Sequence, residues 1–284
     1  MMHFAHVINP VSAPAAAELS RNQPVTFESM RVAQEWAAGR VRVDLLSAQF
    51  PEDRPVIPGF FRQTADLRRS VLDLAAFSRP RKLPLLRDLL DRLYEESAAE
   101  YLIYTNVDIA LQPQFYLEVA RRIAAGHDAL MINRRRLPDR FEGVKDLPKM
   151  YASPGRPHPG FDCFIFHRDL YPRFQLADVC IGIPYIEIVF SQNLFCFARN
   201  FQLLDREFLT FHLGMEIFKR RDPELLNFNR GEFHKAIERL WPDLDSRRFP
   251  WGDKNFLYRM IRWGLHPAIP IRLSLALEPR RWRS

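Results

Sequence analysis

The order of apolar runs and amphipathic segments is the feature that most constrains how this chain can fold. Short apolar, strand-like runs occupy residues 3–9, 41–50, 101–109 and 127–135. Segments with helical periodicity lie between them, at residues 26–39, 83–97 and 112–126. Because strands that alternate with helices favour a parallel sheet covered on both sides, the sequence predicts an α/β fold with a mostly parallel sheet and helices on both faces.

The limits of these helices can be predicted from their ends. The segment 83–97 is the clearest helix, because its leucines recur every three or four residues on one side. The first helix is expected to begin near Thr26 or Ser29, which are suitable capping residues, and to end at Gly39.

Composition narrows the class of protein. The chain has 284 residues, of which 47% are hydrophobic and 26% charged, as expected for a soluble globular protein with a large core. It contains no run of 18 apolar residues and no signal-peptide pattern, so neither a membrane span nor secretion is expected. Cys163, Cys180 and Cys196 have no close-pair spacing and are expected to be buried, reduced thiols in a cytoplasmic protein.

The net charge of +7 favours an anionic partner: nucleic acid, anionic lipid or a phosphorylated small molecule. Nucleic acid is the weakest of these candidates, because no recognition motif for it is present. Glycine-rich phosphate-binding loops are also absent. A bound nucleotide diphosphate would therefore need a divalent metal on a carboxylate, together with basic side chains.

The stretch "EYLIYTNVDIAL" places polar side chains where a predicted strand ends, at Asn106 and Asp108. It resembles the strand and acidic turn of glycosyltransferases with the GT-A fold, a Rossmann-related fold in which a D-x-D motif holds Mn²⁺ or Mg²⁺ against the diphosphate of a nucleotide sugar. The resemblance implies that Asp108 is a metal ligand and that Asn106, in place of the first aspartate, contacts the metal or the ribose. The alternative is a turn in which Asp108 caps the next helix.

Two later stretches extend this resemblance on the acceptor side. In "HPGFDCFIFHRDLYPRF", it implies that Asp162 binds hydroxyls of the sugar or acceptor and that Gly160 allows close backbone approach. In "VCIGIPYIEIVF", it makes Glu187 the first candidate for the general base and Asp162 the second. The alternatives are an Asp162 satisfied by backbone amides in a turn and a Glu187 paired with an arginine.

The stretch "DREFLTFHLG" resembles the histidine that closes the metal shell in several GT-A families, which implies that His212 binds the ion together with Asp108. The alternative is an ordinary core histidine. By the same resemblance, Lys82 and Arg134 would offset the charge of the diphosphate. Asn9, at the end of the first strand, would contact the base or ribose.

The resemblance divides the chain into a GT-A-like catalytic domain over residues 1–215 and a basic, helical extension over residues 216–284. Residues 1–150 would form the nucleotide-sugar half of the domain and residues 150–215 the acceptor half. The tail from Trp251 interleaves aromatic and basic residues, so it could dock on an anionic membrane, although a helix packed on the core is the alternative.

The predicted function is a metal-dependent transfer of sugar from a UDP- or GDP-sugar to a hydroxyl acceptor, lipid-linked acceptors included. It would serve cell-surface polysaccharide or glycoconjugate synthesis, in the cytoplasm or at the inner membrane face. Two other functions stay open. One is a sugar nucleotidyltransferase, and the other is a non-catalytic binding protein on a GT-A scaffold, for which Asn106 is the main support.

Overall fold

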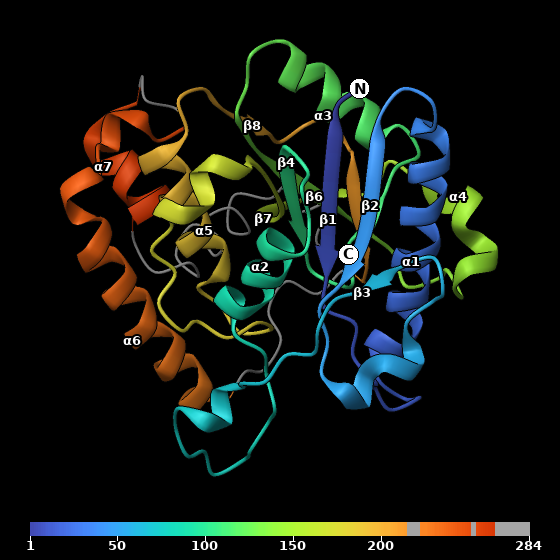
Figure 1. Cartoon of the computed structure of the whole chain (residues 1–284), viewed down its shortest axis with the longest axis horizontal. Helices are drawn as coiled ribbons and strands as arrows, with labels where there is room; N and C mark the ends of the chain where they lie inside the picture. Colours follow the sequence, from blue (N-terminus) through green and yellow to red (C-terminus); the bar gives the residue numbers. More distant parts are fainter. Residues whose placement is uncertain (215–221, 251–253, 265–284) are drawn as a thin grey trace, which may run out of the picture.

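The computed structural model describes residues 1–214, 222–250 and 254–264. Within them, one nine-stranded sheet runs through the molecule in the order β3-β2-β1-β4-β7-β6-β9-β5, and β8 also pairs with β6 (Figure 1). The strands are β1 (His3–Ile8), β2 (Arg42–Ser47), β3 (Arg62–Gln63), β4 (Tyr101–Thr105), β5 (Ala110–Leu111), β6 (Ala129–Leu137), β7 (Arg156–His167), β8 (Phe201–Leu204) and β9 (Thr210–Leu213). Five of the eight pairings are parallel, so the predicted α/β class with a mostly parallel sheet is confirmed.

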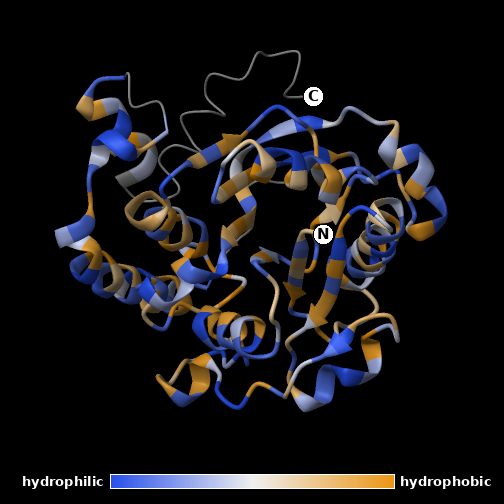
Figure 2. Ribbon diagram, turned by 45° about the horizontal axis from the view of Figure 1, so that its top comes forward, coloured by the Kyte–Doolittle hydropathy of each residue, from blue (hydrophilic) through white to orange (hydrophobic). Residues whose placement is uncertain are grey.

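Helices cover both faces of this sheet, as predicted (Figure 1). They are α1 (Glu18–Ala37), α2 (Leu86–Glu95), α3 (Phe115–Ala124), α4 (Leu147–Tyr151), α5 (Ile186–Phe197), α6 (Pro223–Leu240) and α7 (Phe256–Arg259). Alternate strand residues face opposite ways. Leu102 and Tyr104 share a core with α2 and α5, whereas Ile103 shares one with α1 and α3. The hydropathy view shows the same organisation, with apolar strands enclosed between helices whose outer surfaces are polar (Figure 2).

The expected start of the first helix is wrong. Helix α1 begins at Glu18 and continues through Pro24. Thr26 and Ser29 are buried inside it and cap nothing at its start. The Ser29 hydroxyl instead donates to the Thr26 carbonyl and accepts from the backbone N–H of Leu111, which ties α1 to β5.

The C-terminal part of the described chain packs on the main core. Helix α6 lies against α5, and its Phe233, Ala236 and Leu240 belong to the same buried cluster as α5. The domain boundary at residue 215 stays a prediction. Of the basic tail only residues 254–264 are described, and the remainder lies outside the described residues.

Two further expectations from the sequence concern the membrane and the thiols. In the part of the chain that the structure describes, no helix combines the length and apolar character needed to cross a bilayer. Cys163, Cys180 and Cys196 are all buried free thiols.

A buried polar network lies inside the sheet, directly before the end of β4. The imidazole of His6 has Nδ1 2.8 Å from the Tyr116 hydroxyl and Nε2 2.9 Å from the Thr105 hydroxyl, and it is fully shielded from solvent. Burial lowers the pKa of His6 from 6.5 to about 3. The ring is therefore neutral, and each nitrogen has a hydroxyl that can act as either donor or acceptor.

This shift predicts that the protein loses stability in mild acid. Between pH 6.5 and about pH 3 the unfolded chain binds a proton at His6 that the folded chain excludes. The contribution of His6 to the free energy of unfolding should therefore fall by about 1.4 kcal/mol per pH unit. Urea unfolding at pH 7, 6 and 5 would show a shallower pH dependence for His6→Gln than for the wild type. Equal slopes would contradict the prediction.

Candidate functional site

The polar side chains of the site meet because β7 runs antiparallel between β4 and β6. Register pairs Thr105 of β4 with Cys163 of β7, and Asn133 of β6 with Phe161 of β7. The beginning of β7 therefore lies beside the ends of both neighbours. Residues that are far apart in sequence are thereby collected at the carboxyl edge of β1, β2 and β4, the edge beyond which open α/β sheets bind ligands.

Asp108 and His212 face each other at this edge. The Oδ2 atom of Asp108 lies 3.1 Å from Nε2 of His212, and their side chains are 30% and 6% exposed. Burial raises the pKa of Asp108, but His212 and Arg134 outweigh it and hold that pKa well below its usual range. Asp108 does not cap the following helix, because the N-cap of α3 is Gln114. The carboxylate is therefore free of a capping role and stays ionised.

Asp162 is held by side chains from both neighbouring strands. Its Oδ2 lies 2.8 Å from the Arg134 guanidinium, and its Oδ1 accepts a hydrogen bond of 2.9 Å from Asn106. Burial raises the pKa of Asp162, and the charge of Arg134 partly offsets this. The carbonyl oxygen of Asn106 in turn accepts from the Tyr104 hydroxyl at 2.7 Å. Both ends of the Asn106 amide are thus engaged in fixing Asp162.

Glu187 enters the site through a close approach to Gly160. A Cβ atom on Gly160 would lie 2.8 Å from Oε2 of Glu187 and 2.9 Å from Cε1 of His158, so a larger residue here would displace these side chains. Glu187 lies in the first turn of α5. Tyr185, two residues before Glu187, has a φ of 93°. This value is strained for a bulky residue, and it turns the chain sharply into α5.

Lys82 and Asn9 lie next to the segment that follows β2. The Lys82 ammonium pairs with Glu52 at 2.6 Å and lies 4.1 Å from the centre of the Phe50 ring. The Asn9 amide donates to the Ala48 carbonyl at 2.7 Å. Neither is recorded in contact with Asp108 or Asp162, although β1, β2 and β4 all end at this edge. The roles of Lys82 and Asn9 toward a nucleotide stay predictions.

The donor atoms near Asp108 bear on the predicted metal. Among residues 1–214, 222–250 and 254–264, no three His, Cys, Asp or Glu side chains converge as a ready-made metal group. Asp108 and His212 do supply one carboxylate oxygen and one imidazole nitrogen side by side, and Glu18 Oε1 lies 3.9 Å from His212 Nε2. A two-residue set of this chemistry fits Mn²⁺ or Mg²⁺ when phosphate oxygens and waters complete the shell.

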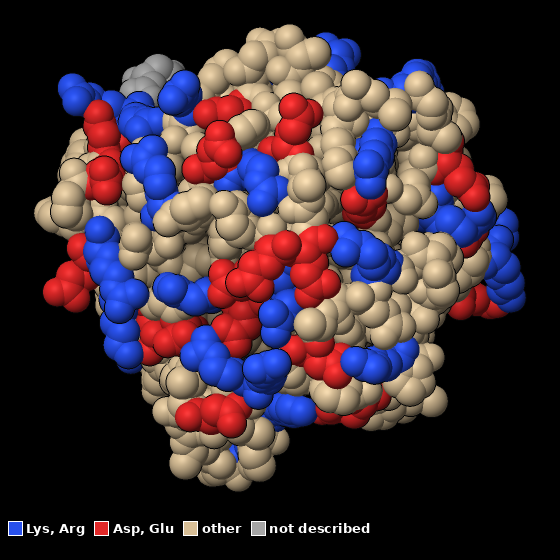
Figure 3. Space-filling view, in the orientation of Figure 1, with Lys and Arg blue, Asp and Glu red and all other residues tan. Residues whose placement is uncertain are grey.

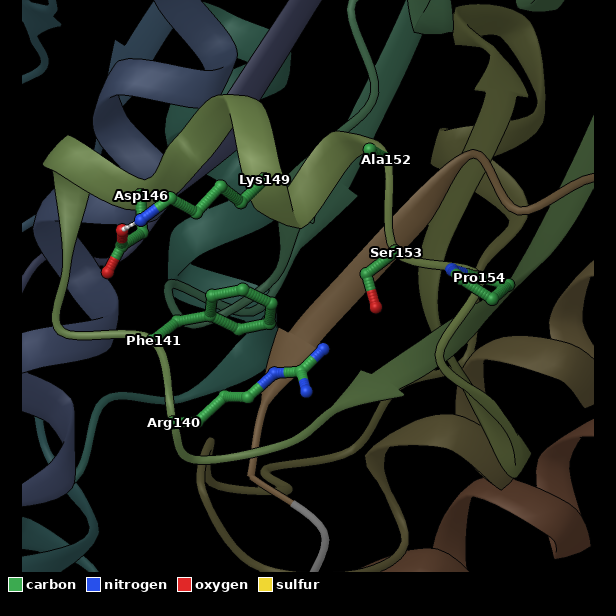
Figure 4. A pocket seen from close by; sticks show the side chains of 7 residues that line it. All are labelled: Arg140, Phe141, Asp146, Lys149, Ala152, Ser153 and Pro154. Carbon is green, nitrogen blue, oxygen red and sulfur yellow. Dashed lines mark hydrogen bonds and ion pairs between the residues drawn. The ribbon is translucent and has the colours of Figure 1, made fainter.

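The distribution of surface charge can be followed on one face of the molecule. On the face shown in Figure 3, acidic and basic side chains interleave. A pocket of about 480 Å³ lies elsewhere, under the loop between β6 and β7 (Figure 4). It is lined by Arg140, Phe141, Asp146, Lys149, Ala152, Ser153 and Pro154. The Nζ atom of Lys149 lies 2.6 Å from Oδ1 of Asp146. Arg140 is the other basic residue that lines this pocket (Figure 4).

Sequence reasoning missed two residues that shape the site. His158 sits in the same stretch as Asp162 and contacts Arg134. Asn133 follows an apolar run within β6, at an irregularity in its pairing with β7, and its amide donates to the carbonyls of His158 and Gly160. An amide directly after an apolar run, as at Asn106, is the sequence signal that could have identified Asn133.

Two solved structures resemble this chain at low sequence identity. No family model and no curated protein matches the sequence. A structure of residues 1–349 of S. aureus TarS in complex with UDP-GlcNAc is 8% identical, with a TM-score of 0.48 over 92% of this chain and 70% of that chain. The M. tuberculosis glucosyl-3-phosphoglycerate synthase with Mn²⁺, UDP and glucosyl-3-phosphoglycerate is 12% identical, with a TM-score of 0.46 over 84% of this chain and 80% of that chain. Values this low support no statement about what this chain binds.

Proposed function

We propose that this chain is a glycosyltransferase that moves a sugar from a nucleotide-diphosphate donor, a UDP- or GDP-sugar, to a hydroxyl acceptor. The observation that supports it most is the 3.1 Å approach of Asp108 to His212, beside the Asp162–Arg134 pair and at the sheet's carboxyl edge. These are the residues that the resemblance to GT-A glycosyltransferases selects. The biological role proposed with it is synthesis of cell-surface polysaccharide or glycoconjugate.

The charge of the site supports a metal-dependent reaction. The Asp108 carboxylate, beside His212, lies at the edge of the sheet where a ligand is expected. A diphosphate brought next to this carboxylate is repelled unless a cation lies between them. Asp108 and His212 would hold Mn²⁺ or Mg²⁺, which when bound supplies the positive charge that stabilises the leaving diphosphate.

The remaining side chains have distinct tasks in this proposal. Glu187 accepts the proton of the acceptor hydroxyl, as a carboxylate held at a fixed place by a helix start. Asp162 accepts hydrogen bonds from hydroxyls of the sugar or acceptor. Arg134 partly offsets the rise that burial causes in the pKa of Asp162 and fixes the direction of that side chain.

The two alternative functions can be weighed against the same residues. A sugar nucleotidyltransferase is disfavoured, because the segment after β1, residues 9–19, contains no glycine that could form a phosphate-binding loop. A non-catalytic scaffold is supported by Asn106, whose amide holds Asp162 and Tyr104. A transferase that relies on Asp108 alone at this turn is compatible with the same contacts.

Donor binding tests the proposal and separates it from a scaffold. Wild-type protein titrated with UDP- and GDP-sugars in a calorimeter should bind one donor with Mn²⁺ present and more weakly in EDTA. Asp108→Ala should lose about tenfold or more in donor affinity in Mn²⁺, because a metal ligand is removed. Asp169→Ala, at a carboxylate that is 82% exposed, is the matched control and should bind as wild type. Absence of donor binding by the wild type in either condition would refute the proposal.

A second experiment isolates the base. Glu187→Gln keeps the shape of the side chain and removes its basicity, so donor affinity should be retained. Hydrolysis of the donor, with water as acceptor, should slow by about 10²- to 10⁴-fold, the usual contribution of general-base catalysis. Unchanged hydrolysis by this variant would show that Glu187 is not the general base. The base would then be Asp162 or neither of the two.

We also propose peripheral membrane contact near α7. Phe256, Leu257 and Tyr258 are 62%, 67% and 45% exposed. Exposed aromatic and aliphatic side chains close to basic ones are typical of interfacial segments. The chain should co-sediment with vesicles that contain phosphatidylglycerol, and a Phe256→Ser, Leu257→Ser double variant should do so less. Trp36→Ser, at a residue 57% exposed on α1, is the control. Equal sedimentation of all three would contradict the membrane contact.

A further inference from the structure

The imidazole of His158 has two nitrogen contacts that cannot both be ordinary hydrogen bonds. Its Nδ1 lies 2.8 Å from the backbone nitrogen of Gly160, and its Nε2 lies 3.1 Å from Nη2 of Arg134. Both partners are obligate donors. Each could donate only to a ring nitrogen that carries no hydrogen, and a neutral imidazole has just one such nitrogen.

The fixed geometry of the turn decides which nitrogen carries the hydrogen. Gly160 follows His158 by two residues, and the Asn133 amide donates to the carbonyls of both, so the turn holds the Gly160 N–H against Nδ1. The ring is 7% exposed, and burial, together with Arg134 and Arg136, holds the pKa of His158 well below its usual range. A neutral ring that accepts at Nδ1 must carry its hydrogen on Nε2.

The Nε2–H group of His158 therefore faces the guanidinium of Arg134, donor to donor. Arg134 cannot turn away freely, because its Nη1 is paired with Asp162 at 2.8 Å. Its Nε is also buried without a hydrogen-bond partner in the described part of the chain. Buried donors without an acceptor are costly, and an inserted oxygen would satisfy them.

We propose that His158 Nε2–H and Arg134 form a metal-independent oxyanion subsite that takes a phosphoryl oxygen. Arg134 supplies the positive charge and the neutral imidazole supplies a directed donor, an arrangement suited to a charge-assisted hydrogen bond. The assignment of this oxygen to a substrate rests on the proposed function. It belongs either to the donor diphosphate or to an acidic group on the acceptor.

Sulfate in EDTA is the probe, because it mimics a phosphoryl group and excludes any role of metal. Wild-type protein should bind it in a calorimetric titration, and His158→Phe, which keeps the ring and removes the donor, should weaken binding about tenfold or more. His167→Phe changes a histidine at the opposite end of β7 and should bind sulfate as wild type does. Equal affinity of His158→Phe and the wild type, or no sulfate binding by the wild type, would overturn the proposal.

Nitrogen NMR of the wild type gives a measurement that does not depend on a variant folding. The His158 ring should be a neutral Nε2–H tautomer, and the Nε2–H resonance should shift as sulfate is added. A ring with its hydrogen on Nδ1, or an Nε2–H resonance that ignores sulfate, would overturn the proposal.

Competition with UDP identifies the source of the oxygen. Displacement of sulfate by UDP assigns the subsite to the donor, and simultaneous binding assigns it to an anionic acceptor; both outcomes support the subsite. The outcome is also separable from the transferase proposal. Sulfate binding without any binding of UDP-sugar or GDP-sugar would support the subsite and refute the transferase. Binding of a UDP- or GDP-sugar without any binding of sulfate would refute the subsite and support the transferase.

Discussion

The site depends on one constraint, which is that β7 runs antiparallel to both of its neighbours, β4 and β6. In a wholly parallel sheet, the start of β7 would lie at the amino edge, far from Asn106 and Asp108. Reversal brings its first half to the carboxyl edge, where Asp162 meets Asn106 from β4 and Arg134 from β6. The ladder of backbone hydrogen bonds along β4, β7 and β6 thus fixes the distances between the polar side chains as well as the fold.

Around this ladder, charged and polar side chains are paired locally. Asp162 is paired with Arg134, and Asp108 lies beside His212, which together with Arg134 holds the pKa of Asp108 below its usual range. Glu18 lies 3.9 Å from His212, and Glu187 closely approaches Gly160, so further carboxylates lie around these pairs. A site that combines carboxylates with a guanidinium can receive a cation at the former and an anion at the latter. That property links the proposed metal, the diphosphate and the subsite at His158.

Much of this organisation could be predicted from the sequence, and the failures have physical causes. The α2 leucines and the β4 run have clear periods, so their elements were predicted correctly. The start of α1 was missed because Pro24 normally interrupts a helix. Here the helix is tied to the sheet on both sides of this proline, by Asn22 to the Leu213 carbonyl and by Ser29 to the Leu111 N–H.

The residues of the site likewise divide into those that could be predicted from the sequence and those that could not. Asn106, Asp108, Asp162 and His212 could be selected because their order along the chain resembles a known family. Strand direction is not encoded in an apolar run, so the contact of Arg134 with Asp162 and the position of His158 could not be predicted. Asn9, assigned by its position, and Lys82, assigned by the resemblance, stay predictions, and their side chains contact Ala48 and Glu52 in the structure.

Helix α5 is enclosed by protein along almost its entire length. From Ile188 to Phe197 every side chain is buried, and three aromatic rings of its core stack at Phe164, Phe190 and Tyr104. Interiors packed in this way resist sliding, because any shift opens voids. The carboxylate of Glu187 is therefore anchored to a rigid wall. In the proposed transfer, the acceptor alcohol would therefore have to move to Glu187, and tolerance for acceptors of different shape would have to come from other parts of the molecule.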